Sequence, residues 1–382
     1  TGTAILTLTT NDPAGPCNPA TSTATVLVKP IPVATSPVTV GPICSGGNAV
    51  ITFNSSINPS TFAWATAVPP GVLATANGNL SPGSNTATLT TPITNNTNTP
   101  QQLTYIVVPS ANGCVGIPDT TTIIIQPVAS VGPFNPIVTC PGATISPSPF
   151  VSNPVGAIFT WTNTNASIGI GVSGVGQISP WTAPSNTNNN SPGTIVGTIT
   201  VLPTFNNCPG TPSAFLVTIN PTPTITNASL TQAICSGANT TAVTWIPSPV
   251  GTTFAWTGAA STPNITGFTA AGSGNLPVMA ISNSGNTPGT VTYTVTPSRN
   301  GCAGPSINYT ITVNPTPVLT LSTNQTICGG TATTASTFSN SVAGGSFTYS
   351  LNSPGLVPAT VTGYATNGNG QIPAATINNS GA

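Results

Sequence analysis

Cysteine recurs along this chain at an almost constant spacing, and that recurrence limits the fold more than any other feature. Four cysteines stand in similar turn sequences and follow one another at 96, 95 and 93 residues. The other four follow the same period, at 97, 94 and 94 residues. The first set is Cys44, Cys140, Cys235 and Cys328, and the second is Cys17, Cys114, Cys208 and Cys302. A fixed period of this kind is typical of an array of similar domains joined end to end.

The near absence of charge excludes several classes of function. The chain has 2 Lys and Arg residues, 2 Asp and Glu residues and no His. A nucleic-acid surface needs clustered Lys and Arg, and a hydrolase triad needs a base, so neither is expected here. Asp12 and Asp119 fall in different repeats, which argues against the facing carboxylates of a glycosidase. We therefore predict no enzyme activity, no cofactor and no nucleic-acid partner.

The cysteines themselves are predicted to form disulfides. Without histidine and without a C-x-x-C pair, the chain cannot supply an ordinary zinc site, so no metal is expected. Regularly spaced cysteines in such a chain indicate an oxidising compartment. No apolar stretch reaches the roughly 18 residues that a membrane span needs. The predicted location is extracellular, at the cell surface, with no membrane span in this region.

One repeat, residues 222–315, shows the expected strands most clearly. Seven short apolar or alternating segments are separated by turn sequences such as Asn300-Gly301, and no segment has helical periodicity. The segments are residues 224–226, 240–245, 253–256, 265–268, 278–281, 291–295 and 307–313. The chain from 226 to Ile234 is expected to be irregular. Seven strands in about 94 residues predict an immunoglobulin-like β-sandwich.

Each repeat carries a pair of aromatic residues, spaced two apart, on its third expected strand. The pairs are Phe62 and Trp64, Phe159 and Trp161, Phe254 and Trp256, and Phe347 and Tyr349. Residues two apart on a strand share a face, so the pairs are predicted to pack in the core between two sheets. A role in stacking on sugars is the alternative for the tryptophans.

Proline-rich segments at Pro30, Pro127, Pro221 and Pro315 are predicted to be stiff boundaries between domains. Complete domains are then expected at residues 31–127, 128–221 and 222–315. Residues 1–30 are expected to be the last two strands of a domain, and residues 316–382 the first part of a further one. These matching ends predict a slice of a longer chain, folded as an elongated rod.

At these residues the chain resembles the PKD-like (polycystic-kidney-disease-like) and immunoglobulin-like repeats of giant secreted surface proteins of Bacteroidota. The resemblance rests on the turn Ile-Cys-Ser-Gly, the Phe-x-Trp strand, the run 290–304 and the closing Ile-Thr-Val-Asn-Pro-Thr-Pro. The second copy departs from it at Asn206-Asn207-Cys208, and the last copy has Tyr349 for the tryptophan. The resemblance implies a stalk or filament of a cell-surface adhesin of the gliding-motility type, exported by type IX secretion. It also implies Thr120, in Asp119-Thr120-Thr121, as an O-glycosylation acceptor.

The pairing of the cysteines is open between two schemes. Proximity in sequence favours pairs within a domain: Cys44–Cys114, Cys140–Cys208 and Cys235–Cys302. In an immunoglobulin-like topology these turns lie at opposite ends of the sandwich, about 25 Å apart, whereas disulfide Cα atoms lie within about 7 Å. In a head-to-tail array the first turn of one domain faces the hairpin of the next. This favours Cys44–Cys208 and Cys140–Cys302, with the partners of the other four outside this chain or absent.

The predicted function is a structural stalk stiffened by disulfides and proline hinges. Its expected partners are the neighbouring domains of the same long chain. The alternative is an array that binds surface glycans or other cell-surface proteins, for which Trp181 is the candidate contact because the other copies lack it. A third hypothesis is a filament of several chains that pair through open ends or edge strands.

Overall fold

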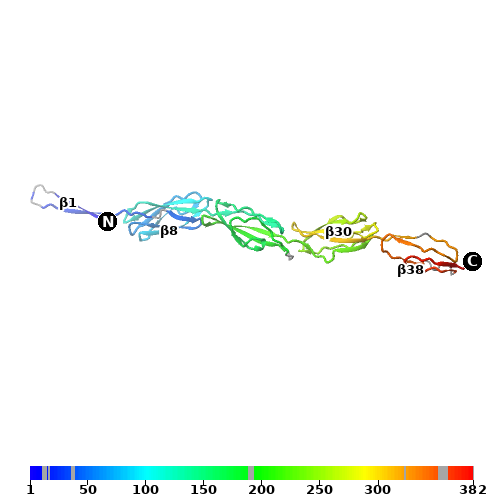
Figure 1. The fold of residues 1–382 in the computed structure, drawn as a ribbon. Coiled ribbons are helices and arrows are strands. Elements are labelled where there is room, and N and C mark those ends of the chain that lie inside the picture. The colour runs from blue at the N-terminus through cyan, green and yellow to red at the C-terminus, as the bar shows by residue number, and fades with distance from the viewer. Residues whose placement is uncertain are drawn as a thin grey trace. The chain divides into compact units, whose positions relative to one another are not determined.

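The structure is a computed structural model that describes residues 1–10, 15, 18–35, 39–187, 193–321, 324–351 and 360–381. Over these residues the chain consists of β-strands and loops, apart from one short 3₁₀ helix, η1, at Ala166–Ile168. Figure 1 shows this strand-only architecture along the chain. The all-β fold with tandem immunoglobulin-like domains that the alternation predicted is confirmed.

The chain forms two compact units. The first contains Thr1–Val138, Ala143–Pro184 and Val196–Thr218, and the second contains Thr139–Gly142, Ser185–Ile195 and Ile219–Ala382. The repeated domains are named here by their strands: the first spans β3 to β12, the second β13 to β22, the third β23 to β32, and the C-terminal domain β33 to β39. The exact boundaries at the four prolines stay a prediction.

The first domain is built on a six-stranded sheet in the order β3-β12-β10-β5-β7, with β11 paired to β10. Two smaller strand pairs, β4 with β8 and β6 with β9, complete it. The bounds are β3 Thr39–Cys44, β4 Asn48–Asn54, β5 Thr61–Thr66, β6 Val72–Leu73, β7 Asn77–Leu80, β8 Thr86–Pro92, β9 Thr94–Asn95, β10 Gln101–Ala111, β11 Cys114–Val115 and β12 Asp119–Gln126. Strict alternation of buried and exposed residues along β8 and β10 gives one apolar face, which closes the core.

The second domain repeats the main sheet in the order β14-β22-β20-β17-β18, with β21 paired to β20. Two strand pairs, β13 with β16 and β15 with β19, accompany it. The bounds are β13 Ser130–Val131, β14 Ile137–Thr139, β15 Thr144–Ile145, β16 Ser152–Asn153, β17 Ile158–Asn163, β18 Ser173–Val175, β19 Trp181–Thr182, β20 Ile195–Phe205, β21 Cys208–Pro209 and β22 Ser213–Ile219. The same strand order recurs because the same alternation recurs in sequence.

The third domain has the main sheet β24-β32-β30-β26-β28, with β31 paired to β30. Its other strand pairs are β23 with β25 and β27 with β29. The bounds are β23 Thr224–Ile225, β24 Thr231–Cys235, β25 Pro247–Ser248, β26 Thr253–Ala260, β27 Ile265–Thr266, β28 Ala271–Ser273, β29 Ser282–Asn283, β30 Gly289–Arg299, β31 Cys302–Ala303 and β32 Ile307–Asn314. In this sheet β24 runs parallel to β32, and the other neighbours are antiparallel.

Three expected segments of this repeat differ in the structure. Residues 240–245 were predicted as a strand but make only the isolated bridge of Val243 to Leu276. Residues 278–281 are likewise outside a strand, and β29 begins just after them. The segment before Cys235, predicted as irregular, is β24. A short parallel edge strand depends on the backbone of β32 for its hydrogen bonds, so local alternation signals it poorly.

The C-terminal domain contains three small sheets over the described residues. These are β33 with β35, β36 with β38, and β34-β39-β37. The bounds are β33 Leu319–Leu321, β34 Thr331–Ala332, β35 Phe338–Asn340, β36 Thr348–Ser350, β37 Val361–Thr362, β38 Asn367–Asn369 and β39 Thr376–Asn379. At the other end of the chain, β1 (Gly2–Thr9) and β2 (Thr21–Val28) form an antiparallel pair whose residues are all exposed.

The predicted core aromatics divide into two groups. Phe62, Trp64, Phe159 and Trp256 are buried. Trp161, Phe254, Phe347 and Tyr349 are half-buried, and Phe254 packs against the buried core of the third domain. All eight still face their own domain. The indole rings of Trp64 and Trp256 pack on Tyr105 and Tyr293 at centroid distances of 5.6 and 5.5 Å.

A glycine lies opposite the second aromatic residue in every copy. The register pairs Trp64 with Gly78, Trp161 with Gly174, Trp256 with Gly272, and Tyr349 with Gly368. A Cβ atom at Gly272 would lie 2.3 Å from Cζ2 of Trp256. The ring therefore lies flat over the neighbouring strand, and only glycine leaves it room.

Candidate functional site: the disulfide-linked junctions

Two disulfides, each inside one compact unit, connect consecutive repeats. Cys44 bonds Cys208 with a Cα–Cα distance of 5.4 Å, and Cys140 bonds Cys302 with a Cα–Cα distance of 5.5 Å. Each joins the first-turn cysteine of one repeat to the hairpin cysteine of the next repeat. The alternative pairs Cys44–Cys114, Cys140–Cys208 and Cys235–Cys302 do not form. Cys44 is bonded to Cys208, and Cys140 is bonded to Cys302, so one member of each alternative pair is already used.

The sheet topology explains why pairs within a domain are out of reach. In the third domain the register places Cys235 opposite Asn314, at the last residue of β32. Cys302 precedes β32 on the hairpin side. The eight residues of β32 separate these two ends by about 26 Å at roughly 3.3 Å per residue. A disulfide spans far less than that.

The first junction is held by hydrogen bonds as well as by the disulfide. The parallel register sets Cys44 opposite Gln126, the last residue of β12. Oε1 of Gln126 accepts a hydrogen bond from Nδ2 of Asn206 at 2.9 Å. Asn206 and Asn207 both have positive φ, at 47° and 64°, in the hairpin turn that presents Cys208. This tight turn places the side chain of Asn206 against the end of β12.

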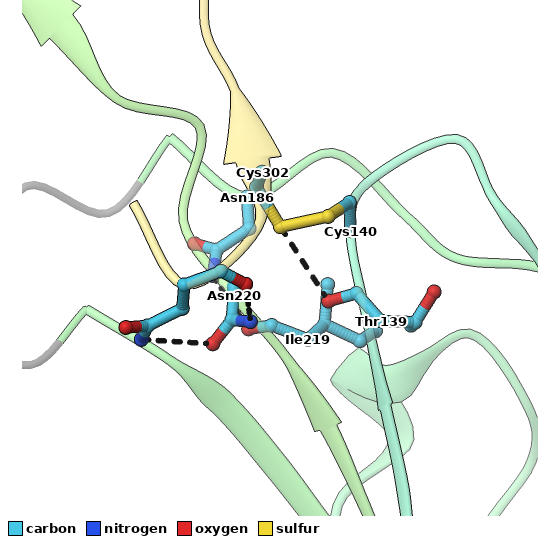
Figure 2. The surroundings of a disulfide bond; sticks show 7 residues. Thr139, Cys140, Asn186, Ile219, Asn220 and Cys302 are labelled. Atoms are coloured by element: carbon cyan, nitrogen blue, oxygen red, sulfur yellow. Dashed lines mark hydrogen bonds between the residues drawn. A yellow bond between two sulfur atoms is a disulfide. The ribbon is translucent and has the colours of Figure 1, made fainter. Parts of the chain in front are cut away.

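The second junction repeats this arrangement (Figure 2). The backbone N–H of Asn220 donates to the carbonyl oxygen of Thr139 at 2.9 Å, and Nδ2 of Asn220 donates to the carbonyl of Asn300 at 3.3 Å. Asn300 has a φ of 48° in the hairpin that leads to Cys302. The end of the second domain's final strand, its first turn and the hairpin of the third domain therefore meet around the Cys140–Cys302 disulfide.

Lys29 makes a third contact between the end of one repeat and the hairpin of the next repeat. Nζ of Lys29 donates to the carbonyl of Asn112 at 2.7 Å, and Asn112 has a φ of 55° in the first domain's hairpin. Lys29 and Asn220 directly follow the final strand of a repeat, and Gln126 is the last residue of such a strand. Lys29 is exposed, and its ammonium binds the next hairpin.

A buried asparagine fastens the final strand of each complete domain, and sequence analysis missed it. Nδ2 of Asn95, Asn186 and Asn283 donates to the carbonyls of Ile125, Ile219 and Val313 at 3.0, 3.0 and 2.9 Å. The same amides donate to a second carbonyl in the following loop at 2.7–2.8 Å. The three side chains are 1–5% exposed. A sequence signal exists, because all three stand near the same point of the repeat.

The first-turn serine supports this asparagine in two of the domains. Oγ of Ser45 accepts from the backbone N–H of Asn95 at 2.8 Å, and Oγ of Ser236 accepts from that of Asn283 at 2.8 Å. The second domain has Pro141 at this position. The Cys-Ser-Gly turn thus links the cysteine to the asparagine that holds the last strand.

The remaining cysteines are placed as follows. Cys114 is half-buried, Cys235 and Cys328 are exposed, and all three are free thiols. Cys17 lies outside the described residues. Cys114 is a hairpin cysteine, whereas Cys235 and Cys328 are first-turn cysteines, so each has the position of a bonded counterpart in another repeat.

The candidate residues for ligand binding and for glycosylation lie outside the disulfide-linked junctions. Trp181 is half-buried, and its Nε1 donates to the carbonyl of Ile168 at 2.8 Å, so its polar edge is engaged inside its own domain. Thr120 is exposed on β12, and its backbone N–H donates to Oδ1 of Asp119 at 2.8 Å. Asp12 lies outside the described residues. Within the described part of the chain no group of three or more His, Cys, Asp or Glu residues gathers.

Burial changes the ionisation of three tyrosines in the domain cores. Desolvation raises the pKa of Tyr105 and of Tyr309 above the ordinary value. It raises the pKa of Tyr293 to about 12, against a smaller lowering effect from the backbone of Thr269. The Tyr293 hydroxyl donates to Sδ of Met279 at 3.2 Å. These shifts reflect core packing, since each charged phenolate would be buried among apolar side chains.

Comparisons with known protein families and solved structures gave the following matches. Residues 41–129 and residues 232–317 match the PKD-like domain family. An I-band fragment of titin is similar in structure with a TM-score of 0.39 and 11% identity, covering 76% of this chain and 100% of that one. The Protocadherin GammaB4 extracellular domain matches with a TM-score of 0.30 and 14% identity, covering 99% of this chain and 67% of that one. No curated protein sequence matches the chain.

The class of protein follows from the sheets and the family match together. The chain is an all-β protein of tandem immunoglobulin-like domains, and its residues 41–129 and 232–317 match the PKD-like domain family. No helix in its described residues is both long and apolar enough to cross a membrane.

Proposed function

We propose that this chain is a structural stalk in a large extracellular surface adhesin, in which covalent and hydrogen-bonded junctions limit bending between domains. The observation that carries the proposal is the repeated disulfide between consecutive repeats, at Cys44–Cys208 and Cys140–Cys302. A flexible linker would leave neighbouring domains free to reorient. A disulfide beside the linker gives each junction a second covalent connection, and two connections oppose rotation about either one.

The location outside the cell is supported by the same bonds. Disulfides persist in secreted and surface proteins and are rare where thiols are kept reduced. The near absence of charge supports a role at an exposed surface, because few interactions in this chain change with salt or near-neutral pH. The finer assignment, a gliding-motility type of adhesin exported by type IX secretion, rests on the resemblance of its repeats.

The proposal excludes catalysis in this region. PKD-like and immunoglobulin-like domains are a non-catalytic domain type, and the junctions are built from amides, hydroxyls and sulfur pairs. The binding-array alternative receives less support, since Trp181 uses its indole N–H within its own domain. The neighbouring domains of the same chain remain the proposed partners.

Removing one disulfide between consecutive domains tests the proposed stalk function. We compare the parent with a chain carrying Cys44→Ser and Cys208→Ser, and use Cys235→Ser, which removes a free exposed thiol, as the matched control. The measurement is the distribution of angles between the first and second domains in electron micrographs of single particles. We expect a broader distribution in the double variant and an unchanged one in the control.

Equal distributions in all three chains would show that the disulfide does not limit bending. In that case the hydrogen bond between Asn206 and Gln126, or the linker itself, would determine the angle. A distribution broadened in the control as well would point to a general loss of structure.

A further inference from the structure

The two disulfides overlap along the sequence. The four bonded cysteines follow one another as Cys44, Cys140, Cys208 and Cys302, and the bonds join the first to the third and the second to the fourth. Their sequence separations are 164 and 162 residues. Residues 140–208 therefore belong to both covalent loops. Bonds within single domains would close separate loops, so the overlap arises because each bond joins consecutive repeats.

Overlapping loops place three backbone segments in parallel. Each disulfide makes its two cysteines one covalent branch point, the first at Cys44–Cys208 and the second at Cys140–Cys302. Three segments connect the two branch points, namely residues 44–140, 140–208 and 208–302. Their lengths are 96, 68 and 94 residues. Any pull that separates the branch points is therefore shared by three segments.

The shortest segment limits how far the branch points can separate. Its 68 residues span about 230 Å when fully extended, at roughly 3.4 Å per residue. Without disulfides, the 258 residues from Cys44 to Cys302 would span about 880 Å. Unfolding of a domain breaks hydrogen bonds and apolar contacts but leaves disulfides intact. This part of the chain therefore loses its fold under tension and still extends to only about a quarter of its backbone length.

Either disulfide alone keeps most of this limit. With only Cys140–Cys302, the shortest route from Cys44 to Cys302 is the 96-residue segment, and with only Cys44–Cys208 it is the 94-residue segment. Compared with the 68-residue segment, losing one bond adds 28 or 26 residues to the extended chain. Losing both adds 190 residues, the difference between 258 and 68. The two bonds are therefore redundant as limits of length.

The folded first junction already presents both covalent routes at one place. Cys44 ends β3 opposite Gln126, which ends β12, so the sulfur and the backbone leave the first domain side by side. The sulfur of Cys44 continues to Cys208, with a Cα–Cα distance of 5.4 Å. The hairpin that presents Cys208 also contacts Gln126 through Asn206, at 2.9 Å. A pull across this junction therefore acts on the linker and on the disulfide together.

Burial protects the branch points while the domains are folded. Cys208 and Cys302 are 3 and 2% exposed, and Cys44 and Cys140 are half-buried. Disulfide exchange requires a thiolate to reach one of the bonded sulfur atoms, so buried sulfur atoms react slowly. Both bonds are thus in place before tension unfolds any domain.

We propose that the overlapping disulfides form an extension limiter, which holds residues 44–302 within the extended length of 68 residues when tension unfolds the domains. The limiter acts within the proposed stalk, on which this proposal rests, and it uses only residues inside the chain. Domains under force unfold at a rate set by their unfolding barrier. A stalk built in this way stays short even after its cores have opened, because its length then depends on covalent bonds.

Stretching single molecules of the full chain tests the limiter. The parent is compared with a chain carrying Cys44→Ser and Cys208→Ser, one carrying Cys140→Ser and Cys302→Ser, and one carrying all four changes. Each pair replaces both members of a bond, so no new thiol appears. Once every domain has unfolded, the contour length should exceed that of the parent by about 95, about 90 and about 650 Å, respectively. Cys235→Ser, which removes an exposed free thiol, should leave the contour length unchanged.

The parent alone gives a second readout, which does not require a variant to fold. Dithiothreitol is added while the unfolded chain is held stretched. Each protein disulfide then becomes two thiols as dithiothreitol is oxidised to its cyclic disulfide. The first bond to be reduced should release only about 90 Å, and the second about 550 Å. Bonds within single domains would instead release three steps of similar size.

Three results would overturn the proposal. The first is a parent whose contour length equals that of the chain without all four cysteines. The second is an additive series, in which the two single-bond losses sum to the lengthening seen when both bonds are lost. The third is a set of equal steps on reduction.

The stalk function fails by a different measurement. Angles between domains are measured on folded molecules without tension, whereas the stretched lengths depend only on which cysteines are bonded. An unchanged angle distribution after loss of Cys44–Cys208 would contradict the stalk, and the stretched lengths would still be as expected.

Discussion

The third domain and the C-terminal domain carry the same sequence anchors but differ in burial. Both have an aromatic residue opposite a glycine, as Trp256 faces Gly272 and Tyr349 faces Gly368. Trp256 is buried and packs on Tyr293 with a centroid distance of 5.5 Å. Tyr349 is half-buried. The same anchor is therefore covered in the third domain and partly exposed in the described part of the C-terminal domain.

The final strand pair covers the anchors of the third domain. In the third domain β30 and β32 supply residues that are wholly buried, among them Tyr293, Ile311 and Val313. In the described part of the C-terminal domain, Phe338, Ile372 and Ile377 line a cavity of about 350 Å³. A β-sandwich core needs apolar faces from both layers, because one layer alone leaves its side chains in water.

The largest expected effect comes from removing the aromatic anchor. Trp256→Ala deletes a buried ring and should destabilise the third domain by about 3–5 kcal/mol. Tyr349→Ala should cost less than about 1 kcal/mol, since its ring is half-exposed. Hydrogen exchange of the amides in β30 and β36 reports each opening free energy separately. Equal losses at both sites would show that the two cores are equivalent in solution.

Replacing the buried asparagine of the third domain should give the next largest difference in stability. Asn283→Ala leaves the buried carbonyl of Val313 and the part-buried carbonyl of Thr287 without their donor, so the third domain should lose about 1–3 kcal/mol. Asn379 is exposed, and Asn379→Ala should change stability by no more than about 0.5 kcal/mol. Urea unfolding followed by exchange in β32 measures the first effect. A loss in Asn283→Ala as small as that in Asn379→Ala would mean that water replaces the amide.

The smallest expected effect is confined to high pH. The pKa of Tyr293 is raised to about 12 in the folded state, so the unfolded tyrosine loses its proton first. The stability that this contributes is complete below about pH 10, the ordinary pKa, and is lost as pH rises through about 12. Tyr293→Phe should flatten the pH dependence of the third domain's melting temperature between these values. An unchanged slope would place the alkaline sensitivity in another residue.

Much of the fold was predictable because its signals are local. The period of the cysteines revealed the repeated domains, and the alternation in β30 and β32 identified the two strands that bury most of the third core. Strand β24 was missed, since its pairing partner lies some eighty residues later in the chain. The asparagines at 95, 186 and 283 were missed for a related reason: a polar residue in a loop looks exposed until a strand end is placed beside it.

By itself, the sequence determined that this is an all-β array of similar domains with almost no charge. The cysteine period and the alternation of apolar and polar residues can both be read directly along the chain. It left two pairings open for Cys44, with Cys114 or with Cys208. Only the tertiary structure decided between them. The parallel pairing of β3 with β12 carries Cys44 to the end of the final strand, away from its own domain's hairpin and next to the following one. A covalent bond depends on distance in space, and spacing along the chain does not report that distance.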